Sequence, residues 1–516
     1  MSRPEEYGSG GGLWQPSWLL WVAVIVLGLC ALTSLAEPVS GLFRYVPRDY
    51  NEGWNAYWSQ VVLAGGQLYP PADSAIANNY PPLFFYVVAP LGRLMGDQIF
   101  AGRLIDVLSL FAMAVNVYAW LTITRSPRIV GAFGALLLLA AFVRYSPEYS
   151  VMDDPQLLAH ATMLTASTLL WRADFSRRAL IGAVVLMILA GLIKHLLLAL
   201  PIATTLWIAA YRRDRLASWI LAGGVGIAVA LTVLYLAYGP PFFQGLMSGR
   251  TYSRYLAISR SRHALVNFLP VIAMAVPALW SLAPSCPWPG LRRRTVFVLM
   301  YFLVASLIGC AAAGGASIDR NVFFDVLIAA CLGAALGLQS LSLIAQKAGV
   351  QQSRRTPALV ALVLAGFLAF QALLRLPADI ATIRALPSNE GQALSDVRLI
   401  RELGHGAVAC ETLALCYWAG SPFRVDFFNY GQKLALHRLP PSSCEHVFAE
   451  SDLRLIQTEP SARSAELSGS LPADCNRIIR DHFVAVRTSF DGLFLLRKSR
   501  AAGAPTRATA AFASPR

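Results

Sequence analysis

Long apolar runs and short polar links alternate along the first 376 residues of the chain. Several runs reach the roughly 20 residues that an α-helix needs to cross a bilayer. The pattern therefore predicts an all-α bundle of membrane-spanning helices. The runs lie at 17–37, 101–123, 129–143, 155–171, 179–211, 216–238, 264–283, 295–313, 321–345 and 357–376.

The pattern changes after this bundle, where polar residues mix with short apolar stretches. The stretch 395–403 has helical spacing, whereas 406–410 and 452–458 are typical of short strands. Alternation around Asp491-Gly492 within 482–498 predicts a β-hairpin. These elements indicate a small α/β domain. The expected domains are the transmembrane bundle at 17–376, the C-terminal α/β domain at 377–499, and disordered ends at 1–16 and 500–516.

Composition and charge support a membrane protein. Charged residues make up 14% of the chain, against about 25% in an average soluble domain. The formal net charge of +14 does not indicate nucleic acid, because the arginines cluster in short links between apolar runs. This positive-inside pattern places those links in the cytoplasm. The clusters are Arg125 and Arg128; Arg172, Arg177 and Arg178; Arg212, Arg213 and Arg215; Arg292, Arg293 and Arg294; and Lys347, Arg354 and Arg355.

The long run 179–211 decides the topology. A single crossing there would place Arg212 outside and invert every later cluster. A hairpin of two short helices, bent near Lys194–His195, keeps all clusters inside. We therefore expect about eleven spans, a cytoplasmic N-terminus, and a C-terminal domain on the outer face.

The first run also admits interpretation as a signal peptide, because residues 33–36 look like a small-residue cleavage site. The apolar stretch is long, however, and Glu5 and Glu6 accompany only one basic residue, Arg3, before it. A retained first helix fits these features better.

The eight cysteines divide between the two regions. Four accompany the apolar runs, where cysteine behaves as a small apolar residue. The other four, Cys410, Cys416, Cys444 and Cys475, lie in the outer domain, where disulfides can form. Two bridges are expected, and the sequence leaves all three pairings open.

Three outward loops hold the residues with candidate chemistry. Two are acidic, and the third is rich in arginine on the side that the positive-inside rule leaves poor in arginine. Guanidinium groups match phosphate oxygens, and a carboxylate can take a proton from a hydroxyl. Together they suggest group transfer from a lipid phosphate. The residues are Asp49 and Glu52 in the loop 41–82; Asp153 and Asp154 in the loop 144–156; and Arg250, Arg254, Arg260 and Arg262 in the loop 239–263.

The order of several short motifs resembles the GT-C superfamily of membrane glycosyltransferases, which use polyprenyl-phosphate sugars. Within it, the chain is similar to protein O-mannosyltransferases, lipid A aminoarabinose transferases and rhizobial galacturonosyltransferases. Each motif is weak alone, but their order and sides agree. They are RDYNEGWNAYW (48–58), GGQLYPP (65–71), NNYPPLFFY (78–86), AGRLIDVLS (101–109), MDDPQLLAHA (152–161) and GLIKHLLLALP (191–201).

The resemblance implies roles for particular residues. An acceptor-activating carboxylate in the first outer loop is matched by Asp49, with Glu52 as its rival. A second acidic position at the start of the fourth helix is matched by Asp154, with Asp153 adjacent. The lysine that the family carries between the fifth and sixth helices is matched by Lys194.

The chain departs from the aminoarabinose transferases at two positions. Asn51-Glu52 stands where they have an Asp-Glu pair, and Tyr80 stands where they have a lysine before the double proline. Binding of the donor phosphate is then expected from Lys194 and the arginines of the third outer loop. Arg320 is a weaker candidate for a sugar or phosphate site.

Simple structural roles compete with these functions. Asp49 and Glu52 could be solvated loop residues, and an aspartate before Pro155 is a common helix cap. The spacing of Arg103 and Asp106 suits an ion pair between them. The aromatic residues Trp54, Tyr57 and Trp58 have helical spacing, which favours a helix lying on the membrane surface.

We predict a glycosyltransferase of the bacterial inner membrane, with its active site facing the periplasm. It would move a sugar from a polyprenyl-phosphate donor to a hydroxyl of a lipid, glycan or protein. We expect no cofactor and no metal, because no His/Cys/carboxylate cluster has ligand spacing. The alternatives are a secondary transporter or lipid flippase, although no internal repeat is visible, and a noncatalytic scaffold.

Overall fold

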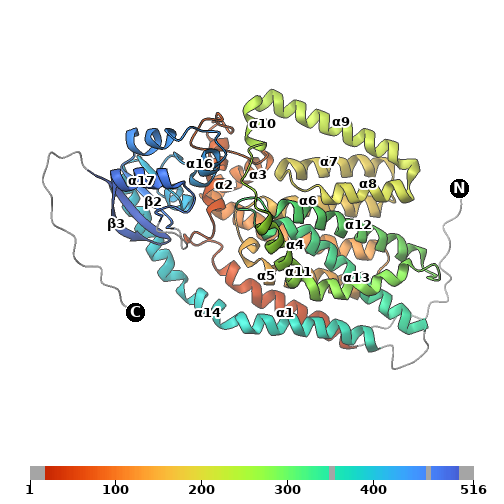
Figure 1. Ribbon diagram of the computed structural model, residues 1–516. Coiled ribbons are helices and arrows are strands. Elements are labelled where there is room, and N and C mark those ends of the chain that lie inside the picture. Colours follow the sequence, from red (N-terminus) through yellow and green to blue (C-terminus); the bar gives the residue numbers. More distant parts are fainter. Residues whose placement is uncertain (1–17, 348–354, 461–465, 499–516) are drawn as a thin grey trace.

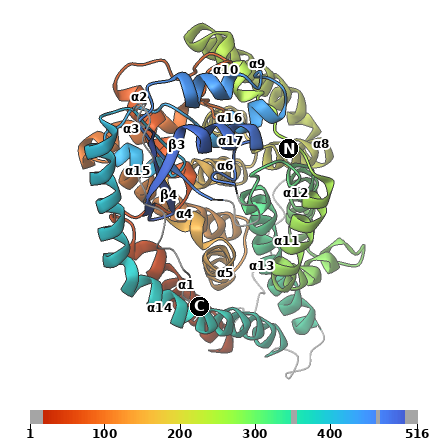
Figure 2. The ribbon, with the colours of Figure 1, turned by 60° about the vertical axis from the view of Figure 1, so that its left-hand side comes forward.

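The computed structural model describes residues 18–347, 355–460 and 466–498. The disordered ends expected at 1–16 and 500–516 lie outside these residues. Long helices lie side by side in a bundle, and a small sheet with short helices forms a C-terminal unit (405–460 and 466–498) at one end of it (Figure 1). Turned by 60°, the molecule shows this unit in front of the bundle, with α14 curving down its side (Figure 2).

The helices of the bundle correspond to the expected apolar runs. Among the described residues, eight helices are long and apolar enough to cross a membrane. These are α1 (Trp18–Ser40), α4 (Gln98–Ile123), α5 (Arg128–Tyr145), α9 (Arg213–Tyr238), α11 (Arg254–Ala275) with η2 (Val276–Leu282), α12 (Pro289–Ala312), α13 (Phe324–Lys347) and α14 (Thr356–Gly404). The other three expected spans are the shorter helices α6 (Gln156–Arg172), α7 (Arg177–Ile193) and α8 (Ala199–Tyr211).

The chain reverses direction between α7 and α8, at the bend expected near Lys194–His195. Arg212, which ends α8, donates hydrogen bonds of 2.9 Å to the carbonyl and the carboxylate of Asp174, which lies just before α7. The start of α7 and the end of α8 therefore lie at the same side of the bundle. This arrangement confirms the hairpin, and it keeps the arginine clusters on one side.

The helix α13 lies at the centre of the bundle: 83% of the most apolar 18-residue stretch of this helix is buried inside the structure. It packs against α5, α11, α12 and α14, and α1 packs against α14 and α5. In contrast, only 6% of the corresponding stretch of α9 is buried. An apolar helix that stays uncovered by protein suits contact with lipid acyl chains.

The C-terminal unit is a four-stranded sheet of order β1-β2-β4-β3 with helices packed on it. The first pair of strands is parallel and the others are antiparallel. The hairpin turns at Asp491, as the alternating pattern predicted. The elements are β1 (Val408–Cys410), α15 (Leu413–Trp418), α16 (Phe427–Ala435), η5 (Glu445–Glu450), β2 (Leu455–Thr458), α17 (Ala473–His482), β3 (Phe483–Ser489) and β4 (Gly492–Arg497).

Two disulfides stabilise this unit internally, and one long helix joins it to the bundle. The disulfides pair Cys410 with Cys416 and Cys444 with Cys475, which resolves the three possible pairings. The 49-residue helix α14 runs from the bundle into the unit and passes residue 377 without a break. The helical stretch 395–403 is therefore the end of this long helix.

The helix α2 (Tyr50–Leu63) is placed differently from the expectation. Its aromatic residues Trp54, Tyr57 and Trp58 are buried, not spread on a membrane surface. They pack between the bundle and the C-terminal unit, where the ring of Tyr57 stacks on Phe423 at 4.8 Å. The expectation of a surface-lying helix was wrong because helical aromatic spacing cannot distinguish lipid from a second layer of protein.

Candidate active site

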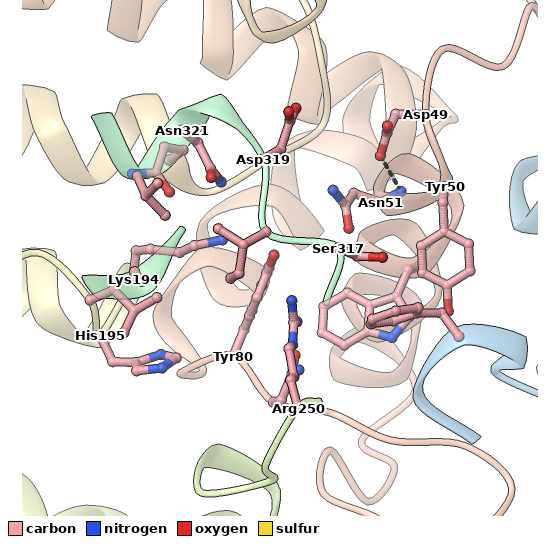
Figure 3. Close-up of a pocket in the computed structure, with 18 of the residues that line it drawn as sticks. Asp49, Tyr50, Asn51, Tyr80, Lys194, His195, Arg250, Ser317, Asp319 and Asn321 are labelled. Atoms are coloured by element: carbon pink, nitrogen blue, oxygen red, sulfur yellow. Dashed lines mark hydrogen bonds between the residues drawn. The ribbon is translucent and has the colours of Figure 1, made fainter. Parts of the chain in front are cut away.

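A cavity of about 600 Å³ lies where the bundle meets the C-terminal unit. Its walls are formed by the ends of elements: the segment before α2, the link after α7, the segment before α11, and the link between α12 and η3 (Arg320–Phe323). Polar side chains converge on it from these ends (Figure 3). The labelled lining residues include Asp49, Tyr80, Lys194, His195, Arg250 and Asp319.

Asp49 is held at the entrance to α2 by its own backbone turn. It is the N-cap residue, and its Oδ1 accepts a hydrogen bond of 2.9 Å from the backbone N–H of Asn51. The side chain is exposed where it lines the cavity. The surrounding protein nevertheless displaces water from the carboxylate, and this desolvation, aided by nearby carboxylates such as Asp154 and Asp319, raises the pKa of Asp49 to about 6. A carboxylate with such a pKa is well suited to accept a proton near neutral pH.

Lys194 supplies a positive charge across the cavity from Asp49. It is the C-cap residue of α7, and its side chain is almost fully buried. The ammonium lies 3.7 Å from the centre of the Tyr80 ring and 4.0 Å from Oδ1 of Asp154. Burial and the charges of Lys194 and Arg250 lower the pKa of His195 to about 4, so this histidine is neutral at physiological pH.

Two of the four arginines of the loop 239–263 line the cavity. Arg250 stacks on the ring of Phe428 at 5.3 Å, and it donates to the carbonyl of Ala316. Arg260 donates to the carbonyls of Ala313 and Gly315 at 2.8 and 2.9 Å, which fixes the link between α12 and η3. The remaining two, Arg254 and Arg262, are exposed and lie outside the cavity lining.

Glu52 does not line the cavity, although its sequence position made it the rival of Asp49. It forms a fully buried ion pair with Arg103, whose Nε and Nη2 donate to the two carboxylate oxygens at 2.7 Å each. Arg103 also donates to the backbone carbonyls of Gly41, Arg44 and Val46. Glu52 and Arg103 thus hold the loop that carries Asp49. Asp106, the expected partner of Arg103, accepts a hydrogen bond from the backbone N–H of Met152.

The remaining acidic and basic candidates support the walls. Asp154 lies just before Pro155, the N-cap residue of α6, accepts from the N–H of Gln156 at 2.8 Å, and lies 4.0 Å from Lys194. Asp153 is fully buried against Gly102 of α4 and does not reach the cavity. Arg320 pairs with Glu148 at 3.3 Å and also lies outside the lining.

The C-terminal unit contributes one wall, which sequence reasoning missed. Glu411, Glu459 and Ser470 line the cavity, and burial together with the charges of Glu411 and Asp49 raises the pKa of Glu459 to about 7. Asp426 is fully buried and accepts hydrogen bonds from the Tyr50 hydroxyl and from Nε1 of Trp54. These bonds attach the unit to α2 beside Asp49.

Two further lining residues, Tyr149 and Asp319, were also missed. Asp319 carried a usable signal, because it adjoins Arg320 at the start of an outward helix. The glutamates of the C-terminal unit carried none, because they follow ordinary short strands. Within the described ranges, no group of three or more His, Cys, Asp or Glu residues could hold a metal ion.

The bundle, the cavity at its end and the attached α/β unit define a polytopic membrane protein with a GT-C fold. It is similar to the crystal structure of ArnT from Cupriavidus metallidurans in the apo state, with a TM-score of 0.59 and 13% identity over 95% of this chain and 100% of that chain. The structure of the same protein bound to undecaprenyl phosphate gives a TM-score of 0.55 and 15% identity, over 94% of this chain and 99% of that chain. No protein-family model and no curated protein matches the chain by sequence.

Proposed function

We propose that this protein is a membrane glycosyltransferase that moves a sugar from a polyprenyl-phosphate donor to an acceptor hydroxyl. The observation that carries the proposal is the cavity that Asp49 lines together with Lys194, Arg250 and Arg260. One carboxylate with a pKa near neutrality and several fixed cations are what such a transfer requires.

The proposed reaction needs only these groups, the donor and the acceptor. The Asp49 carboxylate takes the proton from the acceptor hydroxyl, whose oxygen forms a bond to the anomeric carbon of the sugar. The bond from that carbon to the phosphate oxygen breaks, and its electron pair leaves with the polyprenyl phosphate. Lys194, Arg250 and Arg260 stabilise the charge that develops on this leaving group.

The likeness to ArnT supports the nature of the donor, because one crystal structure of ArnT has undecaprenyl phosphate bound to the protein. In the present chain, Lys194 lies over the ring of Tyr80, the residue that replaces the lysine before the double proline. We infer that Lys194, together with Arg250 and Arg260, holds the donor phosphate without a lysine at position 80.

The side of the membrane is also part of the proposal. Two of the arginine clusters lie close together at the end of the bundle remote from the cavity, because Arg294 donates a 2.9 Å hydrogen bond to Ser126, which lies between Arg125 and Arg128 in the sequence. The positive-inside rule assigns that end to the cytoplasm. The cavity then faces the periplasm of a bacterial inner membrane, where the acceptor is a lipid, glycan or protein.

The proposal is tested with purified full-length protein, a panel of polyprenyl-phosphate sugars and an acceptor extract, by mass spectrometry of released polyprenyl phosphate. We expect release from the wild type with at least one donor, and none from Asp49→Asn. The exposed Asp474→Asn is the matched control and should behave as wild type. Unchanged turnover in Asp49→Asn would exclude Asp49 as the base, and no release with any donor would favour a transporter or flippase.

A further inference from the structure

Two groups of charged residues line different parts of the cavity. One group contains Lys194, His195 and Arg250, which lie close enough to lower the pKa of the histidine. The other group contains Asp49 and Asp319, and Figure 3 shows these two carboxylates together, away from Lys194 and Arg250. The proposed donor phosphate belongs to the cationic group, so the sugar attached to it must extend towards the carboxylates.

Tyr149 lies close to the carboxylates of Asp49 and Asp319. Its side chain is 4% exposed and lines the cavity, and its hydroxyl has no hydrogen-bond partner in the described part of the chain. Burial and the charges of Asp154, Asp319 and Asp49 raise the pKa of this phenol, which stays protonated. A buried hydroxyl that faces a cavity can donate a hydrogen bond to a ligand there and accept one from it.

Asp319 is similarly available. It is the N-cap residue of η3 but makes no side-chain capping hydrogen bond, and its carboxylate has no hydrogen-bond or ion-pair partner among residues 18–347, 355–460 and 466–498. Its neighbour Arg320 is not a counter-ion, because that arginine pairs with Glu148. The carboxylate oxygens are therefore free to accept hydrogen bonds from a ligand in the cavity.

We infer that Tyr149 and Asp319 form a subsite that binds the hydroxyl groups of the transferred sugar and selects a sugar without a carboxylate. This inference rests on the proposed function. Sugar hydroxyls can donate to Asp319 and accept from or donate to Tyr149, and an amino group would also be attracted. A uronic acid would place its carboxylate against Asp319 and Asp49, and like charges that lie close together repel.

The experiment compares matched donors with the wild-type protein: polyprenyl-phosphate hexoses, neutral or as the uronic acid of the same configuration. The neutral donor should have a kcat/KM at least tenfold higher. In Asp319→Asn the preference should fall several-fold, and in Asp319→Lys it should fall further or reverse, whereas Asp474→Asn should keep it. Equal use of both donors by the wild type would overturn the inference and leave the proposed function intact.

A second measurement separates sugar binding from folding. Tyr149→Phe should raise KM for the neutral donor several-fold, while the affinity for undecaprenyl phosphate, which has no sugar, should stay unchanged. A loss of affinity for both molecules would mean that Tyr149 only supports the cavity and would overturn its role. If no donor of any kind released polyprenyl phosphate, the proposed function itself would fail.

Discussion

The buried ion pair between Arg103 and Glu52 gives a prediction whose size follows from the structure. Arg103→Met would remove five hydrogen bonds, two of them to Glu52 at 2.7 Å and three to backbone carbonyls at 2.8–3.0 Å. Glu52 would remain as a fully buried carboxylate that retains the N–H of Arg48 at 3.0 Å. Breaking such a pair by removing one partner costs about 3–5 kcal/mol.

The assay is reversible unfolding of the purified protein in detergent micelles, with Arg477→Met as the matched control. Arg477 pairs with Asp474 at 3.1 Å, but both side chains are 68% exposed, and exposed pairs contribute only about 0–1 kcal/mol. The double variant Arg103→Met/Glu52→Met should be more stable than Arg103→Met alone, because it no longer buries an unpaired charge.

Two results would refute this reasoning. Arg103→Met could be no less stable than Arg477→Met, or the double variant could lose the sum of the two single losses. The same variants also separate the two roles considered for Glu52. Glu52→Gln should lose stability yet keep transfer in the folded fraction, whereas a catalytic base in that position would lose transfer entirely.

Three other predictions concern the cavity. Because the pKa of Asp49 is raised to about 6, kcat/KM should fall as the pH drops through about 6 and the base becomes protonated. In Asp319→Asn, this fall in kcat/KM should occur at lower pH, because a charge that raises the pKa of Asp49 has been removed. A fall at the same pH would contradict the role of Asp49 as the base. Lys194→Met removes a charge-assisted bond of about 1.5–3 kcal/mol, so affinity for undecaprenyl phosphate, measured by competition, should fall about 10- to 100-fold; an unchanged affinity would place the phosphate elsewhere. In Gly53→Ala the added Cβ would lie 2.2 Å from the backbone nitrogen of Ala414, so α2 and α15 must separate and transfer should drop, whereas Gly191→Ala, with nothing within 4 Å, should match wild type in both transfer and melting temperature.

Much of the fold follows from local patterns in the sequence. Apolar runs of bilayer length specify helices, and the arginine clusters required the reversal at Lys194–His195 that the structure contains. Alternation around Asp491-Gly492 was enough to locate the hairpin. These features depend on residues that are neighbours in the chain, so the sequence alone records them.

The site depends on contacts that local patterns do not record. Arg103 has a suitably spaced partner in Asp106 on its own helix, yet it pairs with Glu52, which is 51 residues away. The bond from Trp54 to Asp426 spans 372 residues. Helical spacing shows that a side chain has a buried face but not which element covers it, so the C-terminal wall of the cavity could not be predicted.

The attachment of the C-terminal unit to α2 has a consequence for how the protein is made. A chain is synthesised from its N-terminus, so α2 emerges hundreds of residues before Asp426, which holds Tyr50 and Trp54 in place. The Cys410–Cys416 bridge, which closes the segment carrying Glu411, must also await late translation and an oxidant. A nascent bundle therefore holds Asp49 on a helix that Glu52 and Arg103 fix at its start but that still lacks its contacts with the C-terminal unit. Under the proposed function, transfer competence would be the last property the chain acquires, and a truncated product that still inserts would occupy the membrane without consuming donor.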